Sequence, residues 1–98
     1  MKIVINNCYG GFGLSKEARN YMIGKWVDGE DPRCNLELIA LIEREGSEAV
    51  SDGGSDIRIV EIPDEATDYL INEYDGRESV IYVLDGKICK GEVVNGDD

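Results

Sequence analysis

The chain of 98 residues contains no histidine, and its only cysteines are Cys8, Cys34 and Cys89. Without histidine, no imidazole can complete a metal site with cysteine, and no thiol has an imidazole to activate it. Three widely spaced cysteines are typical of free thiols in a reducing cytosol, not of a disulfide framework. We therefore predict no metal site, no cofactor and no enzymatic activity.

Long apolar runs and an excess of positive charge are also missing. No segment approaches the ~18 apolar residues of a membrane span, and residues 1–7 lack the apolar length of a signal peptide. The 21 acidic and 10 basic residues give a net charge of -11, which opposes approach to nucleic-acid phosphates or an anionic membrane. The sequence predicts a cytoplasmic protein with neither kind of partner.

The remaining composition is that of a globular protein. The 42% hydrophobic and 32% charged residues are typical of a folded domain, and 98 residues suffice for one small core. We predict a single domain over residues 1–94. Residues 95–98 should form a frayed tail, because they contain no apolar anchor.

The first stretch has the order strand, loop, helix. Lys2 to Asn6 contains three consecutive apolar residues, which favours a central strand buried on both faces. A glycine-rich loop follows, and Ser15 is a good cap for a helix that extends to Trp26. If this strand paired in parallel with a later one, the crossover would be right-handed.

The rest of the chain predicts one more helix and four more strands. The second helix should extend from Asn35 to Gly46, although Asp31 followed by Pro32 is a competing start. Asp75-Gly76 and Asp85-Gly86 predict two hairpin turns. The strands are expected at Ile57 to Ile62, Tyr69 to Tyr74, Glu78 to Leu84 and Lys87 to Val94. The predicted fold is α+β, with a mixed sheet of about five strands, a C-terminal antiparallel meander and two helices on one face.

Several short motifs are shared with a known group of sequences. They are Met1 to Asn6 leading into Cys8-Tyr9-Gly10-Gly11-Phe12, then Leu14-Ser15, Glu17-Ala18, Val60 to Asp64, and Glu73 to Gly76 with Glu78. In these motifs the chain resembles a family of small, uncharacterised proteins encoded by bacteriophages and prophages. The resemblance implies an origin and a host compartment. It implies no activity, cofactor or site residue.

The glycine-rich loop is the first candidate site. Exposed amides and the helix dipole at such a loop can hold a phosphate, which would make the protein a nucleotide-binding or phosphate-binding protein. The candidate ligand-binding residues are Tyr9, Gly10, Gly11, Phe12, Gly13, Ser15 and Lys16. The loop has neither the P-loop ending nor a dinucleotide fingerprint, so a purely structural turn is the competing interpretation.

Four carboxylates near the predicted hairpin turns are the second candidate. They are Glu73, Asp75, Glu78 and Asp85. Such groups can bind a partner, act in acid/base chemistry or coordinate a cation, but aspartate is also common in turns for backbone reasons. We assign them to partner binding.

The acidic excess has two interpretations. It can serve solubility alone, or it can attract a protein with a basic surface by standing in for phosphate charge. Together with the phage resemblance and the lack of catalytic groups, it favours an accessory protein that binds and inhibits a host protein, such as a defence nuclease or a transcription protein. The charge is also compatible with a homodimer.

Overall fold

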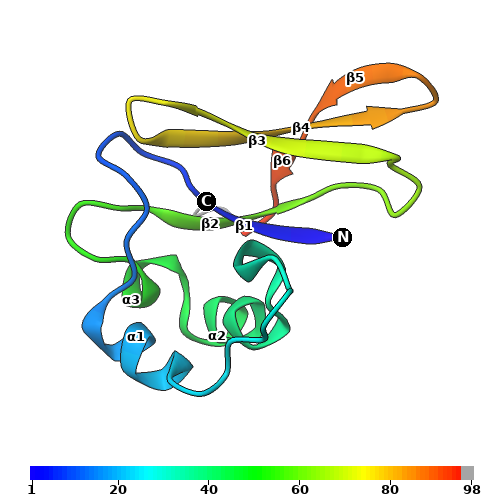
Figure 1. Ribbon diagram of the computed structural model, residues 1–98. Helices are drawn as coiled ribbons and strands as arrows, with labels where there is room; N and C mark the ends of the chain where they lie inside the picture. The colour runs from blue at the N-terminus through cyan, green and yellow to red at the C-terminus, as the bar shows by residue number, and fades with distance from the viewer. Residues whose placement is uncertain (96–98) are drawn as a thin grey trace.

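Three layers stack in the computed structural model, which describes residues 1–95 (Figure 1). Helices lie on one side of an inner sheet, and an outer sheet lies on its other side. Along the chain the elements are β1 (Lys2–Asn6), α1 (Lys16–Met22), η1 (Pro32–Cys34), α2 (Leu36–Glu45), α3 (Ser47–Val50), β2 (Ile57–Glu61), β3 (Asp68–Tyr74), β4 (Arg77–Leu84), β5 (Lys87–Lys90) and β6 (Glu92–Val93). The α+β class is confirmed. The described strands form two antiparallel sheets of three, not one mixed sheet of about five.

The inner sheet has the order β1-β2-β6, so β1 lies at an edge and the prediction of a central position is wrong. It pairs antiparallel with β2, and the crossover considered for a parallel pair does not arise. Burial on both faces is confirmed: Val4 packs among the helices, and Ile3 and Ile5 pack against the outer sheet. Three consecutive apolar residues thus indicate two covered faces but not a place within the sheet.

Helix α1 begins as predicted and ends early. Ser15 Oγ accepts a hydrogen bond from Ala18 N at 3.1 Å, which is the expected N-cap. The helix ends at Met22, not at Trp26, because Gly24 takes a left-handed φ of +79°. Trp26 is 46% exposed and lies outside the core.

Both predicted starts of the second helix exist. Asp31 caps the short 3₁₀ helix η1, and Asn35 caps α2 by accepting from Leu38 N at 3.0 Å. Gly46, with a φ of +90°, ends α2 as predicted. The four-residue α3 follows directly and was not predicted, since it is too short for a periodic apolar pattern.

The outer sheet, with order β3-β4-β5, is the predicted meander. Both Asp-Gly pairs have positive φ at both residues, as a type I′ turn requires. The last predicted strand is divided at Gly91, so that β5 pairs with β4 in the outer sheet and β6 pairs with β2 in the inner sheet. A Cβ at Gly91 would lie 2.5 Å from Val60 Cγ1, so the chain crosses between the sheets where only glycine fits.

The inner sheet separates two apolar clusters. One lies between β1, β2 and the helices and includes Met22, Leu38, Ile42 and Ile59; the other lies between the sheets and includes Ile3, Ile5, Val60, Ile62 and Val80. Among the described residues, no helix is long and apolar enough to cross a membrane.

The chain is anchored up to Asn95, contrary to the predicted fraying there. Asn95 Oδ1 accepts from Ile59 N at 2.7 Å, its Nδ2 donates to Ser47 Oγ at 2.8 Å, and its carbonyl accepts from Arg58 Nη1 at 2.9 Å. Polar bonds hold this residue where an apolar anchor is missing. The rest of the predicted tail, residues 96–98, lies outside the described residues.

Candidate functional site

The glycine-rich loop packs between two other glycine turns. Gly10 N donates to Asp75 O at 3.2 Å, and a Cβ on Gly76 would lie 2.6 Å from Gly10 N. On its other side, a Cβ on Gly10 would lie 2.9 Å from Gly54 O. Close approach of three backbone segments therefore explains these glycines without a ligand.

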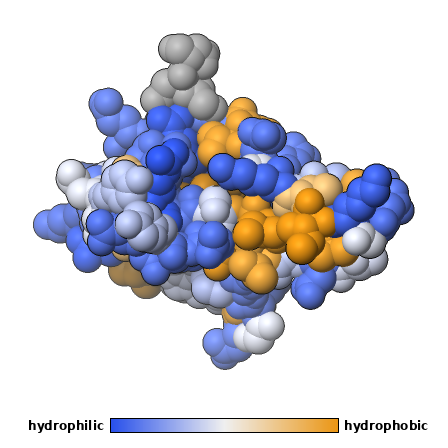
Figure 2. Space-filling view, turned by 90° about the horizontal axis from the view of Figure 1, so that it is seen from above, coloured by the Kyte–Doolittle hydropathy of each residue, from blue (hydrophilic) through white to orange (hydrophobic). Residues whose placement is uncertain are grey.

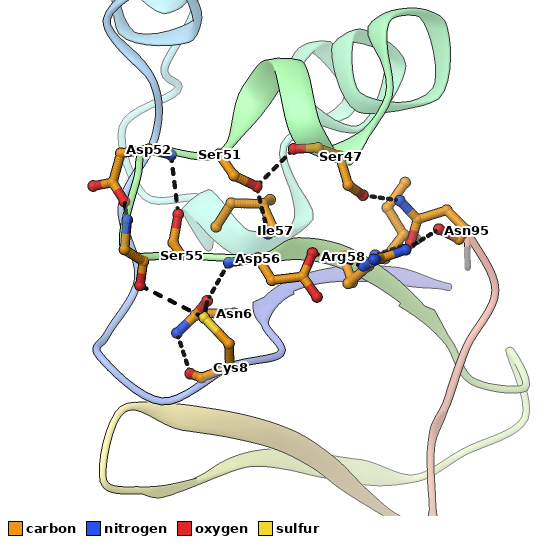
Figure 3. Close-up of polar contacts among 12 residues, drawn as sticks. Asn6, Cys8, Ser47, Ser51, Asp52, Ser55, Asp56, Ile57, Arg58 and Asn95 are labelled. Carbon is orange, nitrogen blue, oxygen red and sulfur yellow. Dashed lines mark hydrogen bonds and ion pairs between the residues drawn. The ribbon is translucent and has the colours of Figure 1, made fainter. Parts of the chain in front are cut away.

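The side chain of Asn6, at the end of β1, ties these three loops together, and Figure 3 shows its contacts with Cys8 and Asp56. It is fully buried; its Nδ2 donates to Cys8 O and to Gly76 O, both at 2.8 Å, and its Oδ1 accepts from Asp56 N at 2.8 Å. Asn6 thus uses both amide hydrogens and its oxygen on backbone groups. The sequence carries no local sign of this role, because the partners come from segments remote in the chain.

Protein groups occupy the start of α1, which was the candidate position for a bound phosphate. Ser15 Oγ donates to Ala49 O at 2.9 Å while it caps Ala18, and Ser15 N donates to Val50 O at 2.8 Å. The Asp52 carboxylate lies so close to Gly13 that a Cβ there would overlap it. A carboxylate beside the loop repels phosphate, so the loop from Tyr9 to Gly13 and the start of α1 at Ser15 and Lys16 lie together in the chain but do not form an open anion cradle.

Glu78 and Arg33 form an ion pair at the free edge of β1. Arg33 Nη1 lies 2.6 Å from Glu78 Oε1 and Nη2 lies 2.8 Å from Oε2, a bidentate arrangement. The same groups bind the outward backbone of β1: Arg33 Nη1 donates to Val4 O at 3.0 Å, and Asn6 N donates to Glu78 Oε1 at 2.8 Å. The pair satisfies the backbone of an edge that has no neighbouring strand in the described part of the chain.

The environment keeps Glu78 ionised although its side chain is only 9% exposed. Burial acts most strongly and favours the neutral acid, but the hydrogen bonds from Arg33 and from Asn6 N together outweigh it and lower the pKa of Glu78 below 4.5. A paired, buried carboxylate cannot present itself to a partner. Glu78 thus has a structural role, and its side chain has too little exposed surface to bind a partner.

The other three carboxylates assigned to partner binding do not converge. Glu73 Oε2 accepts from Gly76 N, and Asp75 belongs to the same turn between β3 and β4. Asp85 belongs to the turn between β4 and β5 at the opposite end of the outer sheet (Figure 1). The structure therefore separates the predicted set into two turns.

A denser group of exposed carboxylates lies between β2 and β3. This acidic stretch contains Glu61, Asp64, Glu65 and Asp68, all exposed, and residues 61–68 include no cation. The amino group of Met1 pairs with Asp64 at 2.8 Å and holds the pKa of that carboxyl below its usual value. Asp31 adds a carboxylate nearby, because it accepts a hydrogen bond from the hydroxyl of Tyr69 at 2.8 Å.

An open cleft of about 500 Å³ lies beside the first residues of β4, which do not pair with β5. Ile5 and Val60 line it from the inner sheet, and Tyr9, Arg77 and Lys90 line it from the surface. Tyr74 packs edge-on against the Tyr9 ring at 6.5 Å, and the Arg77 guanidinium lies 5.9 Å from that ring. Glu78 and Glu92 also line the cleft, so its charge is mixed.

The three cysteines are free thiols in the structure. Cys34 Sγ lies 3.5 Å from the hydroxyl of Tyr69, and this contact, followed by burial and the neighbouring Asp31, raises the pKa of Tyr69 above its usual value. Within residues 1–95, no group of three or more histidine, cysteine, aspartate or glutamate side chains has the arrangement of a metal site.

Comparison with known proteins gives no assignment: no family model, curated protein or solved structure matches the chain.

Proposed function

We propose that the protein acts without catalysis, in the host cytoplasm, by binding a host protein that has a basic surface and blocking or altering it. The observation that carries this proposal is the acidic stretch. Four exposed carboxylates within residues 61–68 have no cation among them, and within residues 1–95 the only ion pair they form is that of Asp64 with the amino terminus. This concentration of negative charge is a surface that a basic groove can recognise.

The physical effect expected from such a surface is fast, directed association. Complementary potentials can raise association rate constants to about 10⁸ M⁻¹s⁻¹ at low salt, from about 10⁵–10⁶ M⁻¹s⁻¹ for neutral partners. A basic groove that normally holds DNA or RNA would attract the acidic stretch for the same reason that it attracts phosphates. A defence nuclease or a transcription protein has such a groove, and occupation of the groove would inhibit it.

The test is capture of a partner from bacterial lysate on the tagged protein, followed by association kinetics across a salt series. Glu65→Lys should slow association strongly, because Glu65 is exposed and lies in the acidic stretch. Glu48→Lys on α3 is the matched control, with the same charge change at an exposed helical position. Association should slow steeply as salt rises, since exposed charges are screened beyond about 10 Å at 0.1 M.

Two results would refute this proposal. One is capture of no host protein. The other is a partner whose association rate ignores salt and responds equally to the two lysine variants.

A second candidate is the binding of a small anionic ligand, and the cleft beside β4 favours it. Arg77 and Lys90 can contact a phosphate there, and Tyr9 can stack on an aromatic ring. A nucleotide at about one hundred times its dissociation constant should stabilise the fold by about 2.7 kcal/mol. Thermal shift against a nucleotide panel measures this, with Arg77→Ala as the variant that should lose the shift. No shift with any nucleotide would exclude this candidate.

A further inference from the structure

The outer face of the outer sheet carries apolar side chains that nothing covers in the described chain. Tyr69, Ile71, Val80 and Tyr82 face the inner sheet, so alternation along the strands turns their neighbours outward. The outward apolar residues are Leu70, Ile81, Val83 and Ile88; Leu70 is 56% exposed and Ile88 is 79% exposed. Figure 2 looks onto this side of the molecule and shows a continuous hydrophobic area there.

Strand register places one charge of each sign at opposite corners of this area. One row across the sheet is Leu70, Ile81, Lys90, and the adjacent row is Asp68, Val83, Ile88. Asp68 therefore lies on β3 at one corner, and Lys90 lies on β5 at the diagonal corner. We call these six residues the outer patch.

The charge of the outer patch distinguishes between possible occupants. Its net charge is zero, whereas the whole chain carries -11. A basic partner would place a cation near Lys90, and an acidic partner would place a carboxylate near Asp68. A second copy, related by a two-fold axis that lies in the plane of contact and runs perpendicular to the line joining Asp68 and Lys90, brings Asp68 of each copy to Lys90 of the other and stacks apolar side chains on apolar side chains.

From this self-complementarity we infer that the protein forms a two-fold symmetric homodimer through the outer patch. The inference goes beyond the proposed function, because the acidic stretch of each copy stays outside the contact apart from Asp68. The three strands have seven, eight and four residues, and at a spacing of about 4.8 Å they give a footprint of at most roughly 14 by 27 Å per copy. This is small for a stable interface, so the dimer should dissociate at micromolar concentrations.

Sedimentation velocity over a concentration series tests the dimer. The wild-type chain should shift from monomer to dimer as concentration rises. Asp68→Lys and Lys90→Asp should each weaken dimerisation at least tenfold, since each variant places like charges opposite one another at both symmetric contacts. An equimolar mixture of the two variants should dimerise again, and so should the chain that carries both substitutions.

The sign of the Asp68→Lys effect separates specific pairing from general charge repulsion. This variant is less negative than the wild type, so weaker overall repulsion alone would strengthen association. Glu37→Lys on α2, with the same charge change on the helical side, is the control and should leave dimerisation intact. All three substituted positions are exposed, and a far-UV spectrum checks that each variant is folded.

Three results would overturn the inference. The first is a wild-type chain that stays monomeric at millimolar concentration. The second is a mixture of the two single variants that fails to dimerise, which would indicate pairing through another surface, such as the edge of β3. The third is an unaffected dimer in both single variants. Binding of a host protein that Ile88→Lys abolishes, without any self-association in the wild type, would assign the patch to that protein instead.

Discussion

The inner and outer sheets contain similar apolar runs but differ in what covers them. Ile3-Val4-Ile5 in β1 is buried on both faces, between the helices and the outer sheet. Ile81-Tyr82-Val83 in β4 is equally apolar, yet only Tyr82 faces another layer, and its neighbours are half-buried on the outer face. A consecutive apolar run is therefore typical of a strand that needs two covers. The structure of one chain supplies both covers to β1 and only one to β4.

Matched isoleucine-to-alanine substitutions in the two sheets should give the largest difference in the free energy of unfolding. Ile59→Ala, at a fully buried position on β2, should destabilise the fold by about 3–4 kcal/mol through lost burial and a cavity. Ile88→Ala on the outer face should change stability by about 0.5 kcal/mol or less. Urea unfolding at low protein concentration, where the chain is monomeric, measures both. Equal effects would mean that the outer face is covered within the monomer.

The two Asp-Gly turns lie at opposite ends of the outer sheet. The turn at Gly76 packs against the glycine-rich loop, whereas no atom lies near the position of a Cβ at Gly86. Gly76→Ala should cost about 3 kcal/mol, because the added Cβ meets the backbone of Gly10 and the left-handed conformation is strained. Gly86 has a similar φ of +75° but no atom near its missing Cβ, so Gly86→Ala should cost only about 1 kcal/mol. Thermal unfolding gives both values. The additional destabilisation by Gly76→Ala over Gly86→Ala measures how tightly the β3–β4 hairpin packs on the glycine-rich loop. Equal destabilisation by the two variants would contradict this packing.

The ion pair at the edge of β1 joins Arg33 of η1 to Glu78 of β4 in the outer sheet. Arg33→Ala should destabilise the fold by about 2–3 kcal/mol, since it leaves the buried Glu78 carboxylate and Val4 O without a cationic donor. Arg44→Ala removes an exposed pair with Glu45 and should cost less than about 0.5 kcal/mol. Chemical denaturation compares the two variants. A cost for Arg33 no larger than that for Arg44 would contradict a structural role of the pair.

The smallest expected effect is the pH dependence of that pair. The pKa of Glu78 is lower in the folded state than the ordinary 4.5, so the unfolded chain binds more protons below that pH. The contribution of Glu78 is fully present above about pH 4.5 and is lost as the pH falls through the folded pKa. In Glu78→Gln this acid-dependent loss should be reduced relative to wild type. An unchanged slope of stability against pH between 5 and 3 would exclude the effect.

Local signals in the sequence predicted most of the individual elements. Ser15 and Asn35 can each bind an exposed amide of the helix that follows, and both cap as expected. The Asp75-Gly76 and Asp85-Gly86 turns formed with the predicted geometry, because glycine and aspartate tolerate the backbone angles of type I′ turns. These caps and turns each depend on residues within four positions of one another, so the sequence predicts them directly.

The candidate sites depend on contacts between remote segments, and these contacts could not be predicted from the sequence. The predicted ligand loop is filled by Asp52 and by the β3–β4 turn, and Glu78 was assigned to partner binding although Arg33 binds it inside the fold. The cleft beside β4 and the roles of Asn6 and Arg33 were missed for the same reason. A lone asparagine after a strand and a lone arginine near a cap carry no signal of what will lie next to them.

The sequence by itself determined the α+β class, the helix caps, the hairpin turns and the acidic charge, because each follows from composition or from neighbouring residues. Only the tertiary structure decided that the strands divide into two sheets, that β1 lies at an edge held by Arg33 and Glu78, and that residues 1–95 leave one apolar sheet face uncovered. The physical reason is that pairing and burial are settled among segments tens of residues apart. At Gly91, a single missing Cβ allows the chain to pass from one sheet to the other.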